Sequence, residues 1–171
     1  MLKLRITLVV CLALLASLSL AQTSAELQAK DAAWKLAIQM VGGKWVGKIG
    51  DFQVIQEFHL EQGGKVIVGH GRVGVGTPTE MPTDSRFGWD PELKQVYYTD
   101  HHSFDTVYAG HVKADGDLLM FDFNGLIGDR GHYKTKSQFT GPDDFSFSMW
   151  QEKDGKLIDT HLNITYHRVK E

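Results

Sequence analysis

Residues 145–168 carry the clearest strand pattern of the chain and read FSFSMWQEKDGKLIDTHLNITYHR. In its first part, Phe145, Phe147 and Met149 alternate with serines, which is the period-two pattern of a β-strand with one apolar face. Asp154-Gly155 follows, a dipeptide that favours a tight type I′ turn because it tolerates positive φ. The residues after the turn alternate again. The stretch therefore predicts two antiparallel strands joined by a short hairpin turn.

The same pattern continues toward the N-terminus. A second Asp-Gly, at Asp115-Gly116, separates the alternating segments Phe104–Lys113 and Leu118–Phe123. Further short alternating runs, separated by turn residues, begin at Lys44, so we expect about ten strands between about residues 44 and 168. Ten consecutive antiparallel strands favour an all-β up-and-down barrel, because closure removes exposed strand edges. A β-sandwich is the alternative.

One helix is expected before the strands, over about residues 24–40. Thr23 and Glu26 have the spacing of a capping box, in which a hydroxyl and a carboxylate three residues apart satisfy the first backbone N–H groups. An apolar stripe follows at helical spacing and is expected to cover apolar surface; it consists of Leu27, Trp34, Ile38 and Val41.

The first 21 residues have the features of a signal peptide. Lys3 and Arg5 precede an apolar run of about 15 residues, and Ser19 and Ala21 place small residues at the positions that a signal peptidase reads. The run is shorter than the roughly 20 residues that span a bilayer, and no later segment approaches that length. We therefore expect cleavage near Ala21, a secreted or periplasmic location, and one mature domain at residues 22–171.

Removal of this segment changes the chemistry of the chain. The only cysteine, Cys11, leaves with it, so the mature protein is expected to lack disulfides, thiol nucleophiles and cysteine-bound metals. Without Lys3 and Arg5, 16 of the 18 basic residues remain against 21 acidic ones, a formal charge of −5. This excess of acid argues against nucleic acids and anionic membrane surfaces as partners.

The two ends of the predicted barrel resemble those of the calycin superfamily, which includes the lipocalins. Gly43-Lys44-Trp45 opens the first strand after a helix, and Arg168 lies in the last strand. The resemblance implies that Arg168 packs across Trp45 and closes the base of the barrel, with Gly43 beside them. A guanidinium over an indole face contributes about 0.5–2 kcal/mol.

Two groups within that superfamily are similar to this chain. Phe87-Gly88-Trp89-Asp90-Pro91 and the C-terminal hairpin resemble a family of exported bacterial lipocalin-like proteins of unassigned function. His161-Leu162-Asn163-Ile164-Thr165-Tyr166 resembles the last strand of nitrobindin, a ten-stranded barrel that holds haem through a histidine of that strand. This second resemblance implies His161 as a candidate axial ligand to haem.

Strand alternation bears on this haem hypothesis. His161, Asn163 and Thr165 share one strand face, whereas Leu162 and Ile164 share the other. A haem inside the barrel requires the polar face to line the cavity. A simple apolar-inside pattern instead places His161 in solvent.

Other residues are candidates for a ligand pocket because they are aromatic, sulfur-bearing or polar residues in predicted strands. Arg72 is included because an inward guanidinium binds a carboxylate through two hydrogen bonds, although an exposed position is the alternative. The candidates are His70, Arg72, Trp89, Tyr98, Tyr108, Met120 and Met149.

The densest polar segment offers a weaker metal hypothesis. His101 or His102 with Asp100 or Asp105 could bind a divalent metal, because imidazole and carboxylate groups are metal ligands. Neighbouring residues of a strand point to opposite faces, however, which favours a polar loop without a metal.

No catalytic motif is present: the chain lacks Gly-x-Ser-x-Gly and His-Glu-x-x-His, and the mature part has no cysteine for a Cys–His pair. The sequence therefore favours an exported lipocalin-like barrel that binds a small apolar or amphipathic ligand, with haem as one candidate. A ligand-free structural or protein-interaction module and an enzyme on the same barrel are the alternatives.

Overall fold

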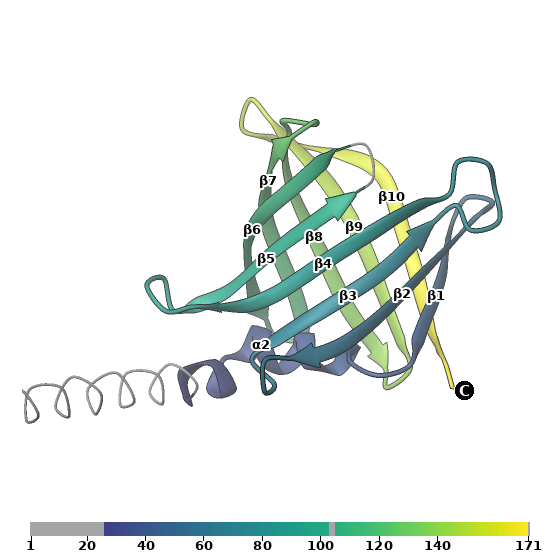
Figure 1. Cartoon of the computed structure of the whole chain (residues 1–171). Helices are drawn as coiled ribbons and strands as arrows, with labels where there is room; N and C mark the ends of the chain where they lie inside the picture. Colours follow the sequence, from purple (N-terminus) through teal and green to yellow (C-terminus); the bar gives the residue numbers. More distant parts are fainter. Residues whose placement is uncertain (1–25, 103–104, 171) are drawn as a thin grey trace, which may run out of the picture.

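A computed structural model describes residues 26–102 and 105–170, and in it ten antiparallel strands close into one barrel (Figure 1). Consecutive strands pair along the chain, and β1 pairs with β10 to complete the closure. The all-β barrel prediction is therefore confirmed. The strands are β1 (Lys44–Ile49), β2 (Phe52–Glu61), β3 (Val66–Val73), β4 (Met81–Asp90), β5 (Gln95–His102), β6 (Thr106–Asp115), β7 (Leu118–Ile127), β8 (His132–Gly141), β9 (Asp144–Lys153) and β10 (Lys156–Val169). The predicted signal peptide lies outside the described residues.

The two Asp-Gly hairpins differ in where the turn begins. Between β9 and β10, the two-residue loop is Asp154-Gly155, and both residues have positive φ, 52° and 70°, as a type I′ turn requires. Between β6 and β7, Asp115 still belongs to β6, and the loop is Gly116-Asp117. The prediction is thus right for the first hairpin and displaced by one residue for the second.

The N-terminal segment is a broken helix instead of the continuous one predicted over about residues 24–40. Residues 26–30 are helical, and a second helix, α2 (Ala32–Ala37), runs into the 3₁₀ turn η1 (Ile38–Met40). The break occurs at Asp31, whose extended backbone caps α2 and whose carboxylate accepts a hydrogen bond from the backbone N–H of Trp34 at 2.9 Å. No helix of residues 26–102 and 105–170 has the length and apolarity to span a membrane.

The helical segment buries a different stripe from the one predicted. Leu27 and Ile38 are 41% and 37% exposed, although Trp34 is buried as expected. The buried face consists instead of Ala33, Trp34, Ala37 and Met40. The interruption at Asp31 separates the register of Leu27 from that of the later residues, whereas Ile38 lies after the break and begins the 3₁₀ turn with an exposed side chain. Figure 1 shows α2 across one end of the barrel, which defines the base.

Arg168 and Trp45 lock the base together. The two residues are partners in the β1–β10 register, and the guanidinium carbon of Arg168 lies 4.3 Å from the centre of the Trp45 ring. The same guanidinium donates hydrogen bonds to the backbone carbonyls of Gln39, Val41 and Gly42. Trp45 Nε1 donates to the carbonyl of Met40 at 2.7 Å. Strand closure and helix docking thus use one pair of side chains, in the arrangement that the resemblance implies.

Gly43 makes this contact sterically feasible. Its φ is +76°, and a Cβ at this position would lie 2.9 Å from Cγ of Arg168. Any other residue would combine an unfavourable backbone conformation with a clash against the methylene groups of the Arg168 side chain.

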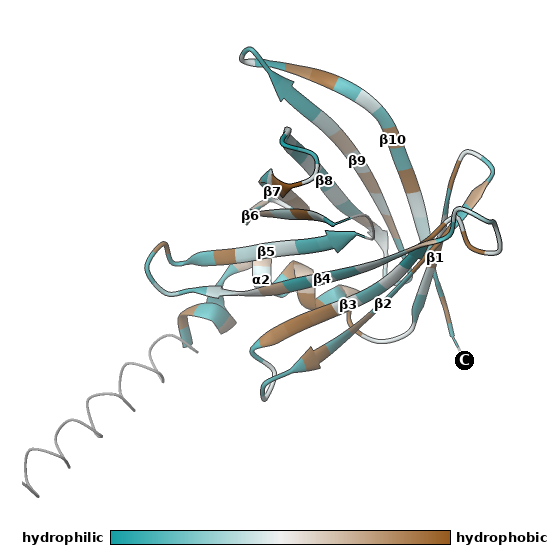
Figure 2. Cartoon of the chain, turned by 45° about the horizontal axis from the view of Figure 1, so that its top comes forward, coloured by the Kyte–Doolittle hydropathy of each residue, from teal (hydrophilic) through white to brown (hydrophobic). Residues whose placement is uncertain are grey.

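The strands above the base present an inner and an outer face. Hydrophobic and hydrophilic residues follow one another along β10 (Figure 2), in which Ile164 and Tyr166 are buried and Thr165 and His167 are exposed. At the base, the interior is filled by Trp45, Ile67, Val96, Val112 and Leu119, each at most 1% exposed. The interior toward the other end is less completely filled.

Replacement of Arg168 by alanine is expected to lower the free energy of unfolding by about 3 kcal/mol, because one cation–π contact and several hydrogen bonds are lost together. Urea unfolding followed by tryptophan fluorescence measures this loss. Arg86→Ala is the matched control, since Arg86 is exposed and approaches Glu61 only at 4.0 Å; a change below about 0.5 kcal/mol is expected there. Equal effects of the two substitutions would contradict the role of Arg168.

Candidate functional site

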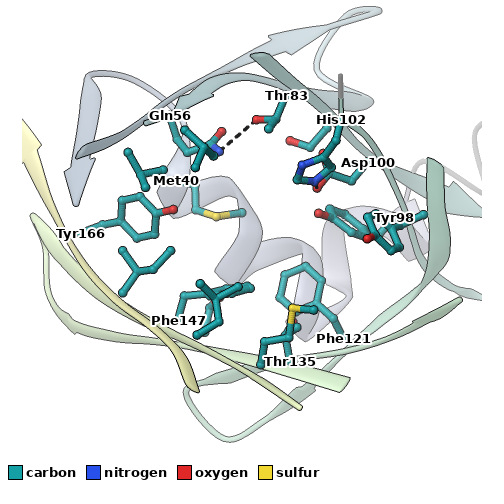
Figure 3. A pocket seen from close by; sticks show the side chains of 18 of the residues that line it. Met40, Gln56, Thr83, Tyr98, Asp100, His102, Phe121, Thr135, Phe147 and Tyr166 are labelled. Carbon is teal, nitrogen blue, oxygen red and sulfur yellow. Dashed lines mark hydrogen bonds and ion pairs between the residues drawn. The ribbon is translucent and has the colours of Figure 1, made fainter. Parts of the chain in front are cut away.

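The barrel encloses a cavity of about 330 Å3 above its base. All ten strands contribute side chains to its lining, and Met40 of η1 reaches it from the helical segment. Figure 3 shows Met40 against the ribbon of this segment, with the other labelled side chains arranged around the cavity. The cavity lies within the range of about 300–1,000 Å3 that is typical of small-molecule sites.

One part of the wall is apolar and comes mainly from β7, β9 and β10. Aromatic and sulfur-bearing side chains offer a large polarisable surface to an apolar ligand. The residues are Phe121, Phe145, Phe147, Met149, Leu162 and Ile164.

The facing part of the wall is polar and comes from β2, β4 and β5. The residues are Gln56, Thr83, Ser85, Asp100 and His102. Gln56 Nε2 donates a hydrogen bond to Thr83 Oγ1 at 3.3 Å, and His102 Nε2 lies 2.8 Å from Asp100 Oδ2. Figure 3 shows these groups on one side of the cavity and Phe121 and Phe147 on the opposite side. The cavity is therefore amphipathic.

Two glycines of β3 allow polar side chains from β2 and β4 to lie close to the β3 backbone. A Cβ at Gly71 would overlap the amide of Gln56, and a Cβ at Gly69 would overlap Ser85 Oγ and the ring of Phe58. Both glycines have ordinary strand backbone, so their role is close approach and not special φ. Side chains from β2 and β4 therefore lie over β3.

Asp100 is the main source of charge in the cavity. Its side chain is 16% exposed; Oδ2 contacts His102, whereas Oδ1 is buried and accepts no hydrogen bond from the described residues. Burial first, and then the negative charge of Asp100, raise the pKa of both Tyr98 and Tyr166 above the ordinary value. Both phenols consequently remain protonated at neutral pH, and they line the cavity as neutral hydroxyl groups.

His102 responds to the same carboxylate. Burial lowers its pKa, but the hydrogen bond that the imidazole donates to Asp100 and the negative charge of Asp100 together outweigh this effect, so the pKa lies above the ordinary 6.5. Such a partly buried acid–base pair is a common feature of ligand and active sites.

Another carboxylate organises the same end of the barrel, because it contacts Tyr108, the register partner of Asp100. Asp129, in the connection between β7 and β8, accepts hydrogen bonds from the hydroxyl groups of Tyr133 and Tyr108. Its second oxygen accepts from the backbone N–H of Gly131 at 2.8 Å. Desolvation, followed by the contact with Asp129, raises the pKa of Tyr133 and Tyr108. The connection is thus fixed against two residues of the barrel wall.

The pocket candidates from the sequence divide between the two faces of the barrel. Tyr98, Tyr108 and Met149 line the cavity. His70 and Arg72 lie on the outer face, where His70 Nδ1 contacts Asp84 at 2.5 Å and Arg72 donates to Glu80 at 3.1 Å.

The remaining two candidates also lie outside the cavity lining. Met120 is set between the buried Leu119 and Phe121, and it lines a shallow depression on the outer surface beside Tyr97. Trp89 is partly buried and packs against the core.

His161 lies outside the residues that line the cavity. It sits in a β-bulge between Asp159 and Leu162, has a φ of 60°, and has a side chain that is 90% exposed. The cavity side of β10 is the aliphatic one, with Leu162 and Ile164. These positions do not fit a haem held inside the cavity by His161, because the imidazole would have to share the face of Leu162. Haem ligation by His161 therefore stays a prediction that the cavity geometry does not support.

His101 and His102, the histidines predicted as possible metal ligands, lie on opposite faces of β5, as strand alternation requires. His102 lines the cavity, His101 is exposed, and Asp105 has a positive φ of 55° before β6. Within residues 26–102 and 105–170, no three His, Cys, Asp or Glu side chains gather in a way that would hold a metal ion.

The sequence singled out Asp100 and His102 only as possible metal ligands and missed Gln56, Thr83 and Ser85, although a signal for all five exists. Thr83 and Ser85 share strand parity with the buried Phe87, and Asp100 and His102 share parity with the buried Val96. Small or polar residues in phase with a buried residue of the same strand point into a barrel. Gln56, in phase with the buried Val54 and Phe58, follows the same rule.

In the native protein, the pKa of His102 is expected above 6.5, and Asp100→Asn is expected to lower it. Because the pKa of His102 is raised only in the folded state, the pairing with Asp100 stabilises the folded protein. This contribution to the free energy of unfolding is complete below about pH 6.5 and is lost as the pH rises through the folded pKa. An NMR titration of the imidazole measures the shift. Asp84→Asn, on the outer face, is the control and should leave the pKa of His102 unchanged; an unchanged pKa in Asp100→Asn would refute the pairing.

Comparison with known proteins supports the fold alone. No protein-family model matches this chain, and no curated protein matches it either. Among solved structures, the chain is similar to one described as "Crystal Structure of Rv2717c from M. tuberculosis", with a TM-score of 0.50 and 18% sequence identity. The match covers 81% of this chain and 98% of the other. The chain thus shares its barrel architecture with a solved protein of low sequence identity.

Proposed function

We propose that this protein is an exported, lipocalin-like barrel that binds a small amphipathic ligand in its interior. The single observation that carries the proposal is the cavity of about 330 Å3, whose largely apolar lining includes a group of polar side chains from β2, β4 and β5. A ligand would place its hydrocarbon part against Phe147 and Met149 and its polar group against Asp100 and His102.

The energetics favour a ligand that uses both walls. Burial of about 200 Å2 of apolar ligand surface contributes roughly 5 kcal/mol at 25 cal/mol per Å2. The loss of translational and rotational freedom on association consumes much of this gain. Apolar contact alone therefore gives weak binding, and the hydrogen-bonding groups on the polar wall supply the remaining affinity and the orientation.

The alternatives receive less support. A ligand-free structural module is expected to fill its interior with side chains, which the cavity argues against. An enzyme on this barrel calls for His, Arg and carboxylate groups that converge inside. Asp100 and His102 do meet there, but among the described residues no arginine lines the cavity. Ligand binding accounts for more of the lining than catalysis does.

Filling the cavity with a larger side chain is expected to weaken ligand binding. Met149→Trp adds an indole to the space beside Phe147 and Leu162, so the affinity for a fluorescent apolar probe such as N-phenylnaphthylamine should fall at least about tenfold, or 1.4 kcal/mol. Ser148→Trp is the matched control, because it places the same side chain on the outer face of the same strand, opposite Lys136 and Asn163. Circular dichroism checks that both variants fold. Equal probe binding by wild type and Met149→Trp would contradict an interior site.

Export is a separate part of the proposal and has its own test. The arrangement of charge, apolar run and small residues before Gln22 predicts cleavage after Ala21. Expression of the full chain in a bacterium with separated periplasmic and cytoplasmic fractions, followed by N-terminal sequencing, should give a periplasmic protein that begins at Gln22. A cytoplasmic protein that retains Met1 would contradict export.

A further inference from the structure

We propose that the ligand carries, besides the polar group at Asp100 and His102, a neutral carbonyl oxygen that accepts a hydrogen bond from the Tyr166 hydroxyl. A ketone, an ester or an amide within the hydrocarbon part of the ligand would supply this oxygen. The inference rests on the proposed ligand-binding function and names the ligand class of the same cavity. The observation behind it is a buried phenol that faces the cavity and has no hydrogen-bond partner among the described residues.

The Tyr166 hydroxyl is buried in the barrel but can be reached from the cavity. The residue is 6% exposed and lines the cavity. Figure 3 shows its hydroxyl pointing into the cavity. Asp100 Oδ1 and Thr135 Oγ1 are sealed in the wall, whereas the Tyr166 oxygen is not. A ligand atom can therefore come within hydrogen-bond distance of this hydroxyl.

The other two tyrosines of the lining already have acceptors. Tyr98 donates a hydrogen bond to the Asp100 carboxylate, and Tyr108 donates one to Asp129 at 3.5 Å. For Tyr166, burial and the charge of Asp100 raise the pKa, and no hydrogen bond to another described residue contributes. A buried hydroxyl without a partner has lost hydration that nothing in the protein replaces. Of these three phenols, Tyr166 is the one that is left to donate to a ligand.

The surroundings of Tyr166 favour an uncharged acceptor. The ring stacks on Phe145 with the centroids 4.6 Å apart, and Ile164 lies on the same face of β10. Tyr166 comes from β10 and Asp100 from β5, five strands away around the barrel, and Figure 3 shows the two residues on opposite sides of the cavity. Among the described residues, no lysine or arginine lines the cavity. A ligand carboxylate at Tyr166 would therefore be buried without a cation as its partner.

A carbonyl also suits this position better than an alcohol does. Burial disfavours the phenolate and raises the pKa of Tyr166, so its hydroxyl keeps the proton that it donates. A carbonyl oxygen accepts this proton and brings none of its own. An alcohol brings a second proton, for which the neighbouring lining residues Phe145, Phe147 and Ile164 have no side-chain acceptor.

The test compares two ligands that differ only at the oxygen: 2-octanone, and 2-methyl-1-octene, in which a methylidene group replaces the carbonyl oxygen. Each is used to displace N-phenylnaphthylamine from the wild-type protein and from Tyr166→Phe, which keeps the ring and loses the hydroxyl. The affinity for 2-octanone should fall about three- to tenfold in the variant, the size of one neutral hydrogen bond. The affinity for the alkene should change less than about twofold. Tyr97→Phe, the same change at the depression on the outer surface, should affect neither ligand.

Infrared spectroscopy observes the hydrogen bond itself. The carbonyl stretch of bound 2-octanone, labelled with carbon-13, is expected at a lower frequency than in hexane, because a hydrogen bond weakens the C=O bond. In Tyr166→Phe the stretch should move back toward the hexane value. A stretch at the hexane value in the wild-type complex would overturn the inference. That measurement needs no variant, so a folding defect in Tyr166→Phe leaves the inference testable.

The outcomes separate this inference from the proposed function. If the probe and both ligands fail to bind to the wild type, the ligand-binding function itself is refuted. If Tyr166→Phe folds and weakens both ligands equally, or leaves the affinity for 2-octanone unchanged, the carbonyl site at Tyr166 is overturned while ligand binding stands. Octanoate at pH 8 is the charged comparison and should bind at least about tenfold more weakly than 2-octanone. Tighter binding of octanoate would overturn the preference for a neutral group.

Discussion

The stacking of Arg168 on Trp45 is the contact on which the rest of the molecule depends. It joins the last strand to the first, so it closes the barrel, and its hydrogen bonds to the carbonyls of Gln39, Val41 and Gly42 dock the helical segment on the base. A barrel closed in this way has no free strand edge. Its inner face must then either be filled by side chains or remain as a cavity.

The interior of the barrel is filled near the base and contains the cavity toward the other end. Near the base, large apolar side chains such as Trp45 and Leu119 fill the interior. Toward the other end, Gln56, Ser85 and Phe58 pack over Gly69 and Gly71 of β3, and a cavity remains between these side chains and the opposite strands. The cavity thus results from small inward residues on one side of the barrel, opposite aromatic residues on the other. That unequal distribution gives the interior its polar and apolar walls, and with them the proposed preference for an amphipathic ligand.

Much of the fold could be predicted from the sequence, because strand alternation and turn chemistry are local. The serines between Phe145, Phe147 and Met149 reveal the inner face of β9, and Asp154-Gly155 identifies its hairpin. The break in the helix at Asp31 could not be foreseen in this way. The hydrogen bond from the backbone N–H of Trp34 to the Asp31 carboxylate competes with continuation of the helix through Asp31. Which of the two forms depends on how the segment docks against the barrel.

The site could be predicted less well, because its chemistry depends on which strand face points inward. His101 and His102 have equal ligand potential in the sequence, yet only His102 lines the cavity. Resemblance directed attention to His161, whereas the bulge beside Asp159 and the aliphatic inner face of β10 place it outside the cavity lining. Asp100 and His102 were candidates from the sequence only as metal ligands, whereas the structure shows them as a pair in the cavity lining.

The central claim, a ligand inside the barrel, is tested most directly by NMR on protein with labelled methionine methyl groups. Met40, Met81 and Met149 line the cavity, whereas Met120 lies on the outer surface, so the chain carries its own inside and outside reporters. With bound 2-octanone, intermolecular nuclear Overhauser effects are expected from the alkyl chain to the methyl groups of Met40 and Met149 and none to Met120. Effects confined to Met120, or a saturated complex without effects to the cavity methionines, would contradict it.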